Sequence, residues 1–347
     1  MLRLAARLLF GVMATLIAAE GLFRLLPVST ATFTGYHHDP DLLTYPAHHH
    51  WRVATGWDLR NAQMLSSNNQ GFVAAHDFVV DPKAVALIGD SFVEASMLDA
   101  ADRPGAQLER QLGGRTVYAM GGPGSSLLDY AQRIRWASRR FKVRDMVLLL
   151  ERYDARQALC GSGNVHSRCL DRETLAPRIV RQEPAGSLKR ILRYSALAQY
   201  LAGQIKFRPE VLWRAMFSPR SSETSASASS VSIPPDLGKI ALVRRQVDAV
   251  TSTFFETVRE HRVGRLVVLV DGRRQGSGSG SELIDLERTH LMTRLREGGA
   301  VVIDLEPVYA RHAENSRRSL DVGPYDGHLN SLGIELAMRE AARVLTP

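Results

Sequence analysis

The sequence predicts an α/β fold, a flavodoxin-like three-layer sandwich around a doubly wound parallel sheet of five strands. Three observations support this prediction. Short apolar runs recur along the chain, segments with helical spacing separate them, and the alternation extends from residue 83 to the C-terminus. Strands that alternate with helices form βαβ units, whose parallel strands are covered by helices on both faces.

The five apolar runs are short, as expected for buried strands. They lie at residues 83–88, 115–120, 145–150, 265–270 and 300–305. Helical spacing is found at residues 100–112, 125–140, 238–262, 281–297 and 331–345. The composition, 45% hydrophobic and 23% charged residues, is that of an ordinary globular protein with a packed core.

One long insertion, at about residues 160–237, interrupts the alternation of strands and helices between the third and fourth strands. We expect a helical part around 188–217, followed by a mobile loop at 221–230, because its serine-rich composition buries little apolar surface. A second flexible segment is expected at 276–280. The chain thus divides into a signal anchor at 1–28, an irregular lead-in at 29–80 and an α/β domain at 81–347 that contains the insertion.

The N-terminal segment predicts a membrane anchor. Arg3 and Arg7 precede the apolar run 8–19, and apolar residues resume after Glu20. A membrane span needs about 20 apolar residues, so a signal-peptide core is one alternative, and an amphipathic helix of a soluble protein is another. No small-x-small cleavage site follows Ala19. We therefore favour an uncleaved single-pass anchor in the inner membrane, with the body in the periplasm or outside the cell.

The two cysteines agree with export. Cys160 and Cys169 enclose a short polar loop, and outside the cytoplasm such a pair is expected to form a disulfide. Two unrelated thiols are the alternative. A metal site is disfavoured at this pair because only His166 lies nearby as a further ligand. It is also disfavoured at the histidines of the lead-in, whose spacing places no ligand set on one face of a helix or strand: His37, His38, His48, His49 and His50.

The charge of the chain suggests no nucleic-acid partner. The formal net charge is +8, but the 44 Lys and Arg residues are scattered, without a nucleic-acid motif or a basic stripe interleaved with aromatic residues. Acidic glycans or anionic lipid surfaces suit this charge better. The sequence also lacks G-x-G-x-x-G and G-x-x-x-x-G-K-[ST], which argues against a nucleotide- or flavin-binding domain. We expect no metal or organic cofactor.

Ser91 is the candidate nucleophile. It follows the first apolar run directly, in Gly89-Asp90-Ser91, and so lies at the carboxyl edge of the sheet, where open α/β folds bind ligands. A serine hydroxyl needs a base to take its proton and donors to stabilise the oxyanion. From this tripeptide alone, a serine that merely caps the following helix is an equal alternative.

His328 and Asp326 favour the catalytic interpretation. They lie on a loop between the last strand and the terminal helix. Loops that follow parallel strands gather on one edge of the sheet, so His328 can meet Ser91 across 237 positions of sequence. Asp326 can hold the other nitrogen of the imidazole. A loop histidine beside a turn aspartate is the alternative.

These blocks resemble those of the SGNH (GDSL-type) hydrolases. The likeness consists of Gly89-Asp90-Ser91 after a strand, a glycine block at 121–126 and Asp-x-His-x-Asn-x-x-Gly at 326–333. The segment 67–72 (SNNQGF) is similar to the lead-in of membrane-anchored bacterial members. The resemblance covers about residues 67–345 and implies the fold of that family.

The resemblance also implies roles for single residues. Ser91 becomes the nucleophile, whose backbone N–H helps to form the oxyanion hole, His328 the general base and Asp326 its orienting partner. Gly124 best matches the family glycine whose N–H points at the oxyanion, and Gly122 is the second choice. A glycine cluster that only makes a tight turn is the alternative. Asp90 is assigned with these glycines to the oxyanion and substrate-binding group.

The third block departs from the family pattern. The family has an Asn after the third strand that donates its side-chain N–H to the oxyanion, and this chain has Glu151-Arg152-Tyr153-Asp154 there. Losing one such donor costs about 3 kcal/mol of transition-state stabilisation if nothing replaces it. Tyr153 or Arg152 is the expected substitute, with Asn164 a remote one. The Asp-x-His spacing resembles that of relatives that acetylate exported polysaccharides.

The sequence therefore predicts a membrane-anchored extracytoplasmic serine esterase that works through a Ser91 acyl-enzyme. Its expected substrate is an acylated carbohydrate or a small ester, with hydrolysis or transfer of acetyl groups on an envelope glycan as the reaction. The alternative is a catalytically weakened domain that binds an envelope polysaccharide or an assembly partner without turnover.

Overall fold

The computed structural model describes residues 2–30, 37–39, 42–162, 168–180, 186–205, 237–261, 263–274, 282–323 and 326–346. At its centre is a five-stranded parallel sheet in the order β6-β5-β7-β10-β11. The chain moves outward from β5 to β6, returns to the other side of β5 at β7, and continues outward through β10 and β11. This doubly wound order confirms the predicted fold class.

The five strands lie where the apolar runs predict them, with ends that differ by at most two residues. They are β5 (Val85–Gly89), β6 (Val117–Gly121), β7 (Asp145–Leu150), β10 (Arg265–Val270) and β11 (Val301–Asp304). Every residue of β5, β6 and β7 is buried. Continuous apolar runs of this kind are expected for strands covered on both faces.

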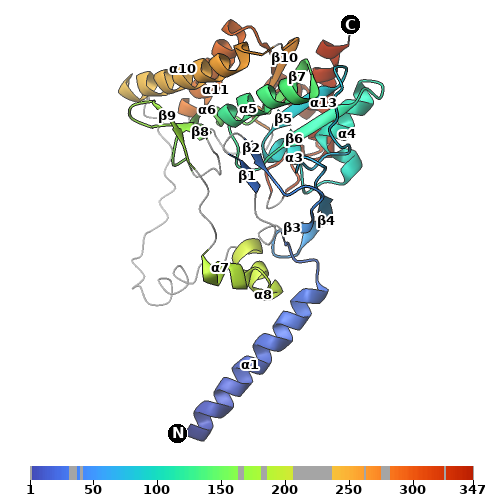
Figure 1. Cartoon of the computed structure of the whole chain (residues 1–347), viewed down its shortest axis with the longest axis vertical. Helices are drawn as coiled ribbons and strands as arrows, with labels where there is room; N and C mark the ends of the chain where they lie inside the picture. The colour runs from blue at the N-terminus through green and yellow to red at the C-terminus, as the bar shows by residue number, and fades with distance from the viewer. Residues whose placement is uncertain are drawn as a thin grey trace.

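Helices cover both faces of the sheet (Figure 1). Alternate strand side chains such as Ile88 and Leu148 pack on α5 (Leu127–Trp136), α10 (Leu237–Arg259) and α11 (Glu282–Glu297). The other set, including Leu87 and Leu149, packs on the opposite layer. That layer comprises α3 (Ser91–Glu94), α4 (Pro104–Gln111), α12 (Glu306–Asn315) and α13 (Ser331–Leu345).

The sequence suggested an irregular lead-in at 29–80, but the structure shows regular elements there. It contains two antiparallel strand pairs, β1 (His37–Asp39) with β2 (Leu42–Thr44), and β3 (His50–Thr55) with β4 (Arg60–Ser66). Tyr45, Trp51, Leu65 and Val73 form a small core of their own. The sequence hides this hairpin because β4 has only one buried residue, so it lacks the alternation that marks a half-buried strand.

The 67–72 segment fixes the lead-in to the α/β domain. The Asn68 side chain donates to His76 O (2.9 Å) and accepts from Phe72 N (3.0 Å), which folds the segment into a tight loop. Gly71 has φ +81°, and a Cβ there would lie 1.9 Å from Tyr45 O. Phe72 is fully buried in the main core. These contacts explain the motif in structural terms.

The insertion contains several short elements. They are β8 (Arg168–Leu170), β9 (Pro177–Ile179), α7 (Ser187–Leu192), α8 (Ala196–Ala198) and the π-helical turn η3 (Gln199–Gln204), and α6 (Asp154–Gln157) precedes them. The predicted disulfide between Cys160 and Cys169 is present. The predicted loops at 221–230 and 276–280 lie outside the described residues, as do Asn164 and His166.

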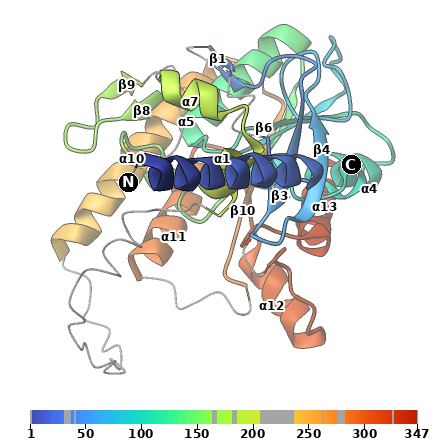
Figure 2. The same cartoon turned by 90° about the horizontal axis from the view of Figure 1, so that it is seen from below.

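Helix α1 (Leu2–Leu25) projects from the body of the molecule, with the N-terminus at its far end (Figure 1). By length and composition it can cross a membrane. Short α8 packs on its C-terminal part, and in the view from below α1 lies in front of the body of the molecule (Figure 2).

Candidate active site

Ser91 is placed by a sharp turn from strand to helix. β5 ends at Gly89, where a Cβ would lie 2.5 Å from Val93 Cγ2 and 2.8 Å from Leu149 O, so only glycine fits. The Asp90 side chain caps α3 by accepting a hydrogen bond from Phe92 N (2.8 Å). Ser91 thus becomes the first residue of α3, half-buried at the carboxyl edge of the sheet.

His328 lies on the loop before α13, which Asn330 and Gly333 hold in place. The Asn330 side chain caps α13 by accepting from Gly333 N (3.0 Å), and it donates to Ser319 O (2.7 Å). A Cβ on Gly333 would lie 2.9 Å from Leu320 O. The Asn-x-x-Gly part of the last block therefore positions the loop.

The structure brings Ser91, His328 and Asp326 together. His328 Nε2 lies 2.8 Å from Ser91 Oγ, and His328 Nδ1 is hydrogen-bonded to the Asp326 carboxylate. That contact assigns the ring proton to Nδ1 and leaves Nε2 free to accept the serine proton. Burial opposes ionisation of Asp326, but the hydrogen bonds from the His328 side chain and backbone outweigh it and lower the Asp326 pKa. A serine, a base and an orienting carboxylate in this order can perform acyl transfer.

Of the two N–H groups of the glycine block that are candidates for stabilising an oxyanion, only that of Gly124 has no hydrogen-bond partner among the described residues. The Gly122 N–H already donates to Gly89 O (3.1 Å). Gly124 has φ +75°. Among the described residues, neither the Gly124 N–H nor the Ser91 N–H has a hydrogen-bond partner. These two amides are therefore the candidates for an oxyanion hole.

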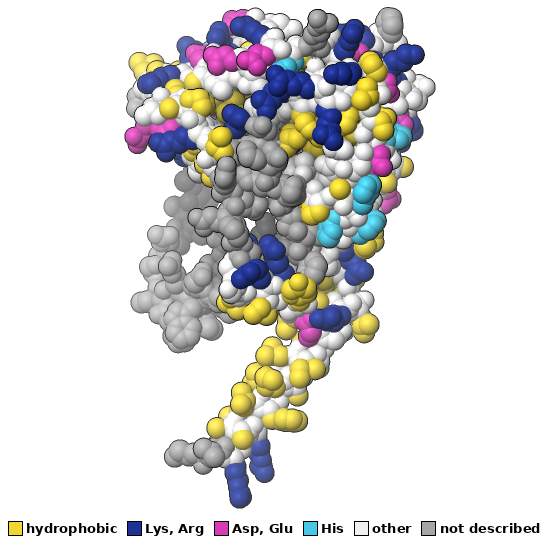
Figure 3. Space-filling view, in the orientation of Figure 1, with side chains coloured by type: hydrophobic (Ala, Val, Ile, Leu, Met, Phe, Trp, Pro, Cys, Tyr) yellow, Lys and Arg dark blue, Asp and Glu magenta, His cyan; other side chains and the backbone are white. Residues whose placement is uncertain are grey.

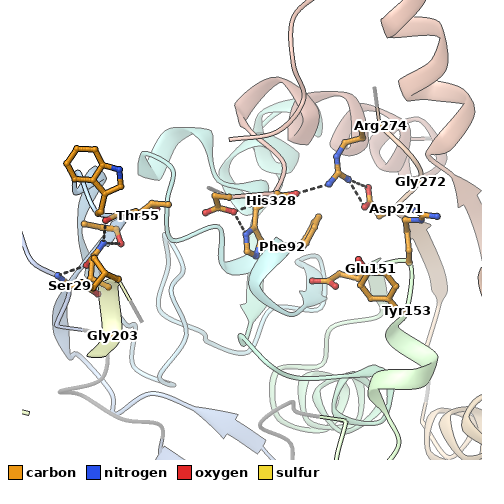
Figure 4. Close-up of a pocket in the computed structure, with 18 residues that line it drawn as sticks. Ser29, Thr55, Phe92, Glu151, Tyr153, Gly203, Asp271, Gly272, Arg274 and His328 are labelled. Carbon is orange, nitrogen blue, oxygen red and sulfur yellow. Dashed lines mark hydrogen bonds and ion pairs between the residues drawn. The ribbon is translucent and has the colours of Figure 1, made fainter. Parts of the chain in front are cut away.

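A cavity of about 790 Å³ opens beside His328 (Figure 4). Its walls come from the end of β7, the end of β10, the His328 loop, the β3–β4 turn and η3. The lining residues used below are Trp57, Glu151, Tyr153, Gln204, Asp271 and Arg274. Tyr153, the proposed substitute donor, is 38% exposed at the cavity wall, whereas Arg152 is ion-paired with Asp285 (2.9 Å). Asp90 and Gly124 do not line this cavity.

Three acidic side chains, Asp90, Glu151 and Asp154, cluster beside the cavity, where the sequence resemblance leads one to expect Asn. Burial, followed by the charges of Glu151 and Asp154, raises the pKa of Asp90. Burial and Glu151 likewise raise the pKa of Asp154, whose Oδ2 accepts from Glu151 N (3.0 Å). The departure noted in the sequence therefore places a carboxyl group, and not an amide donor, at the cavity wall.

Sequence reasoning missed Arg274, which connects the His328 loop to β10. Its guanidinium contacts both oxygens of Asp271 (2.7 and 2.6 Å), pairs with Asp321 and donates to Gly327 O (2.7 Å). Figure 4 shows the Arg274–Asp271 pair beside His328. The signal was present, because Asp271-Gly272-Arg273-Arg274 follows the fourth predicted strand on the catalytic edge.

Sequence reasoning also missed Arg133, a fully buried residue of α5. It donates to Gly89 O (2.5 Å), Met120 O (3.1 Å) and Ser125 Oγ (2.9 Å), and a Cβ on Gly122 would lie 2.3 Å from its Nη2. Arg133 thus supports both the Ser91 turn and the glycine block from beneath. No sequence signal distinguishes it from the other arginines of this helix.

The variant Arg133→Met is expected to lower the free energy of unfolding by about 3–5 kcal/mol, because it leaves buried acceptors without their charged donor. Urea titration of the full chain in detergent measures this loss. Arg139→Met, at an exposed site in the following π-helical turn η2 (Ala137–Phe141), is the control and should change stability by less than about 0.5 kcal/mol. Equal stability of the two variants would contradict the support role of Arg133.

Glu94, on α3 next to Ser91, is a second buried ionisable group. Burial raises its pKa from 4.5 to about 7, although Tyr45, Arg103 and Arg133 partly oppose the shift. Its Oε2 is buried and has no partner among the described residues. The folded chain therefore binds this proton more tightly than the unfolded chain.

Wild-type stability is expected to fall as pH rises from about 4.5 to above 7, because ionising Glu94 in the folded state costs about 3 kcal/mol. The Glu94→Gln variant has no proton to lose at this position. The difference between its free energy of unfolding and that of the wild type should therefore shift in favour of the variant by about 3 kcal/mol from pH 5 to pH 8. Urea titrations at both pH values measure the difference. The exposed control Glu297→Gln should show none, and an equally flat result for Glu94→Gln would refute the buried, protonated state.

Within the described residues, no group of three or more His, Cys, Asp or Glu side chains could hold a metal ion.

Comparisons with known proteins give matches only among solved structures; no family model and no curated protein matches the chain. LAE5, an alpha/beta hydrolase enzyme from the metagenome of Lake Arreo, is 13% identical over 78% of this chain and 99% of its own, with a TM-score of 0.39. A lipolytic G-D-S-L family member from Veillonella parvula is 12% identical over 76% and 97%, with a TM-score of 0.40. The acetyl xylan esterase Est2A from Butyrivibrio proteoclasticus is 8% identical over 82% and 70%, with a TM-score of 0.31.

Proposed function

We propose that the protein is a serine esterase of SGNH type that forms an acyl-enzyme on Ser91. One observation carries the proposal: Asp326, His328 and Ser91 form a hydrogen-bonded chain, of which Asp326 and His328 line the cavity. A helix cap needs no such chain, since Asp90 already caps α3. The joint arrangement therefore favours the catalytic interpretation of Ser91.

In the proposed mechanism, His328 Nε2 takes the proton of Ser91 as the oxygen attacks the ester carbonyl. The N–H groups of Ser91 and Gly124 stabilise the oxyanion, with Tyr153 as a further donor from the cavity wall. Protonated His328 then gives its proton to the leaving alcohol, and Asp326 stabilises the imidazolium throughout. Water or a sugar hydroxyl, activated by the same His328 nitrogen, releases the acyl group.

We propose an acetylated envelope glycan as the substrate, and the cavity supports this choice. Trp57 is 63% exposed on the β3–β4 turn and lines the cavity together with polar groups such as Gln204. An exposed aromatic face beside hydrogen-bonding side chains suits a sugar ring better than a purely apolar chain. Hydrolysis and acetyl transfer share every step up to the acyl-enzyme.

Trp57→Ala is expected to raise KM for an acetylated oligosaccharide about tenfold, which corresponds to ~1.4 kcal/mol of lost binding. The kcat/KM for a small aryl acetate, which does not reach this turn, should change little. Trp57→Phe keeps an aromatic face and serves as the matched control. An equal loss on both substrates would point to a structural role for Trp57 instead.

We further propose that α1 anchors the chain in the inner membrane and that the body, residues 29–347, lies outside the cytoplasm. The length and composition of α1 and the Cys160–Cys169 disulfide support this location. The domain division given by the sequence, with the α/β domain at 81–347, is retained as part of the proposal.

Acetate release from aryl acetates, with and without oligosaccharide acceptors, tests the function. The full chain in detergent should turn over the aryl ester, and a transferase should turn over faster with the acceptor and yield acetylated sugar. Acetate release that ignores every acceptor would identify a hydrolase. No turnover by folded protein would favour the second candidate, a glycan-binding domain, for which Glu151 in place of a donor is the supporting observation.

A further inference from the structure

Glu20, the acidic residue that interrupts the apolar run of α1, has a structural role. Its carboxylate accepts hydrogen bonds from Ser195 Oγ (2.7 Å), Ala196 N (3.0 Å) and Leu197 N (3.0 Å), at the start of α8. Arg24, one turn later, donates to Glu20 (2.8 Å) and to Tyr194 O (3.1 Å). The insertion is therefore hydrogen-bonded to the anchor helix itself.

The position of Glu20 along α1 determines how deep this contact would lie in a bilayer. Helix α1 has 24 residues and is about 36 Å long, somewhat more than the ~30 Å hydrocarbon core of a bilayer. Glu20 lies five residues before the end of α1 at Leu25, which is about 7 Å along the axis. With Leu2 at one edge of a ~30 Å hydrocarbon core, Glu20 lies about 27 Å along the axis, close to the opposite edge. If α1 spans a bilayer in this way, residues 194–197 lie at the boundary between acyl chains and headgroups.

The segment 186–205, which contains α7, α8 and η3, has the composition of an interfacial helix. Large apolar side chains on α7 and just after it are exposed: Leu188 (69%), Ile191 (70%), Leu192 (43%) and Tyr194 (69%). Lys189 and Arg190 are exposed among them. Figure 3 shows hydrophobic side chains gathered on the lower side of this segment, the side from which α1 projects. Exposed apolar side chains beside basic ones are typical of helices that lie on anionic membranes.

We propose that the segment 186–205 lies on the anionic surface of the bilayer that α1 crosses. Its apolar side chains enter the boundary between headgroups and acyl chains, and Lys189 and Arg190 contact lipid phosphates. The proposal rests on the anchor proposed above. Two observations select lipid as the occupant: the surface is continuous with a membrane-spanning helix, and its charge complements anionic headgroups.

This placement also locates the catalytic cavity. The far end of the same segment forms part of the cavity wall, where Gln204 donates to Ala54 O (2.7 Å) and Gly56 O (3.0 Å). The Phe23 ring of α1 stacks on Tyr200 at 4.4 Å, so this end is also held to the anchor. Tyr194 and Gln204 are ten residues apart, about 15 Å at helical rise. The cavity therefore opens close to the bilayer, where a lipid-linked or membrane-emerging glycan would pass.

Fluorescence quenching in nanodiscs tests the proposal on the full chain. Both native cysteines are in the disulfide, so Ile191→Cys introduces a single thiol for an environment-sensitive probe. Nitroxide-labelled lipids should quench most of its emission, and more strongly when phosphatidylglycerol is included. Leu237→Cys, at an 81% exposed position on α10, is the control and should be quenched only by a soluble agent.

The possible outcomes distinguish failure of this surface proposal from failure of the proposal that α1 is a membrane anchor. A probe at Leu16→Cys in α1 reports whether α1 lies in the bilayer. Lipid quenching at Leu16 but not at Ile191 overturns the surface proposal alone, and absence of quenching at both positions overturns the anchor as well. Shielding of Ile191 from the soluble agent without lipid quenching would mean that protein covers this surface, which also contradicts the proposal.

Discussion

Replacing Ser91 by alanine is expected to lower the kcat for aryl acetate hydrolysis by roughly 10⁴- to 10⁶-fold. The substitution removes the atom that forms the acyl-enzyme, while His328 and the backbone amides remain. The fold should survive, because the cap of α3 is made by Asp90 and not by Ser91. Steady-state kinetics of the full chain in detergent, together with a thermal unfolding curve, measures both effects.

The matched control is Ser66→Ala, which removes an exposed hydroxyl from β4. Its kcat should equal that of the wild type. If Ser91→Ala kept more than about a tenth of the wild-type kcat, the acyl-enzyme on Ser91 would be contradicted, since triad nucleophiles contribute far more.

The second large effect is expected from Asp326→Asn, a loss of roughly 10⁴-fold in kcat. An asparagine amide can donate to His328 Nδ1, and the ring proton would then lie on Nε2, which could no longer accept the serine proton. The imidazolium would also lose its carboxylate partner. Because the Asp326 pKa lies below its ordinary value, the wild-type carboxylate is ionised at pH 5 and above, so the difference should persist across the neutral range.

Asp102→Asn is the matched control, since Asp102 lies outside the cavity in the short helix η1 (Ala100–Asp102). Comparing kcat and KM separates the roles: the Asp326 variant should lose kcat with KM little changed, because Asp326 orients the base. A variant with normal kcat and a raised KM would instead assign Asp326 to substrate binding.

Much of this architecture could be predicted from the sequence, for identifiable reasons. The runs 145–150 and 265–270 each have one charged residue followed by five apolar ones, and these two strands were predicted to the residue, whereas the ends of the other three differ by one or two residues. Parallel strands place their following loops on one edge, which is why Ser91 and His328 could be expected to meet. In both cases a local pattern combines with a general rule of topology.

The remaining features depend on contacts that no local pattern reveals. Glu20 looks like a flaw in an apolar helix until its partners, 175–177 positions away, are known. Arg133 resembles any other arginine of its helix until its buried acceptors are seen. The hairpin β3–β4 is mostly polar and is stabilised by Trp51 and Leu65 meeting in a core that only the fold creates.

Covalent labelling by a fluorophosphonate tests the central claim most directly, because the probe reacts only with a serine activated by its base. Intact-mass analysis of the folded full chain should show one adduct on the wild type, a far slower reaction for His328→Gln, and none for Ser91→Ala. An unlabelled wild type, or equal labelling of Ser91→Ala, would contradict the proposal that Ser91 is the nucleophile of an esterase.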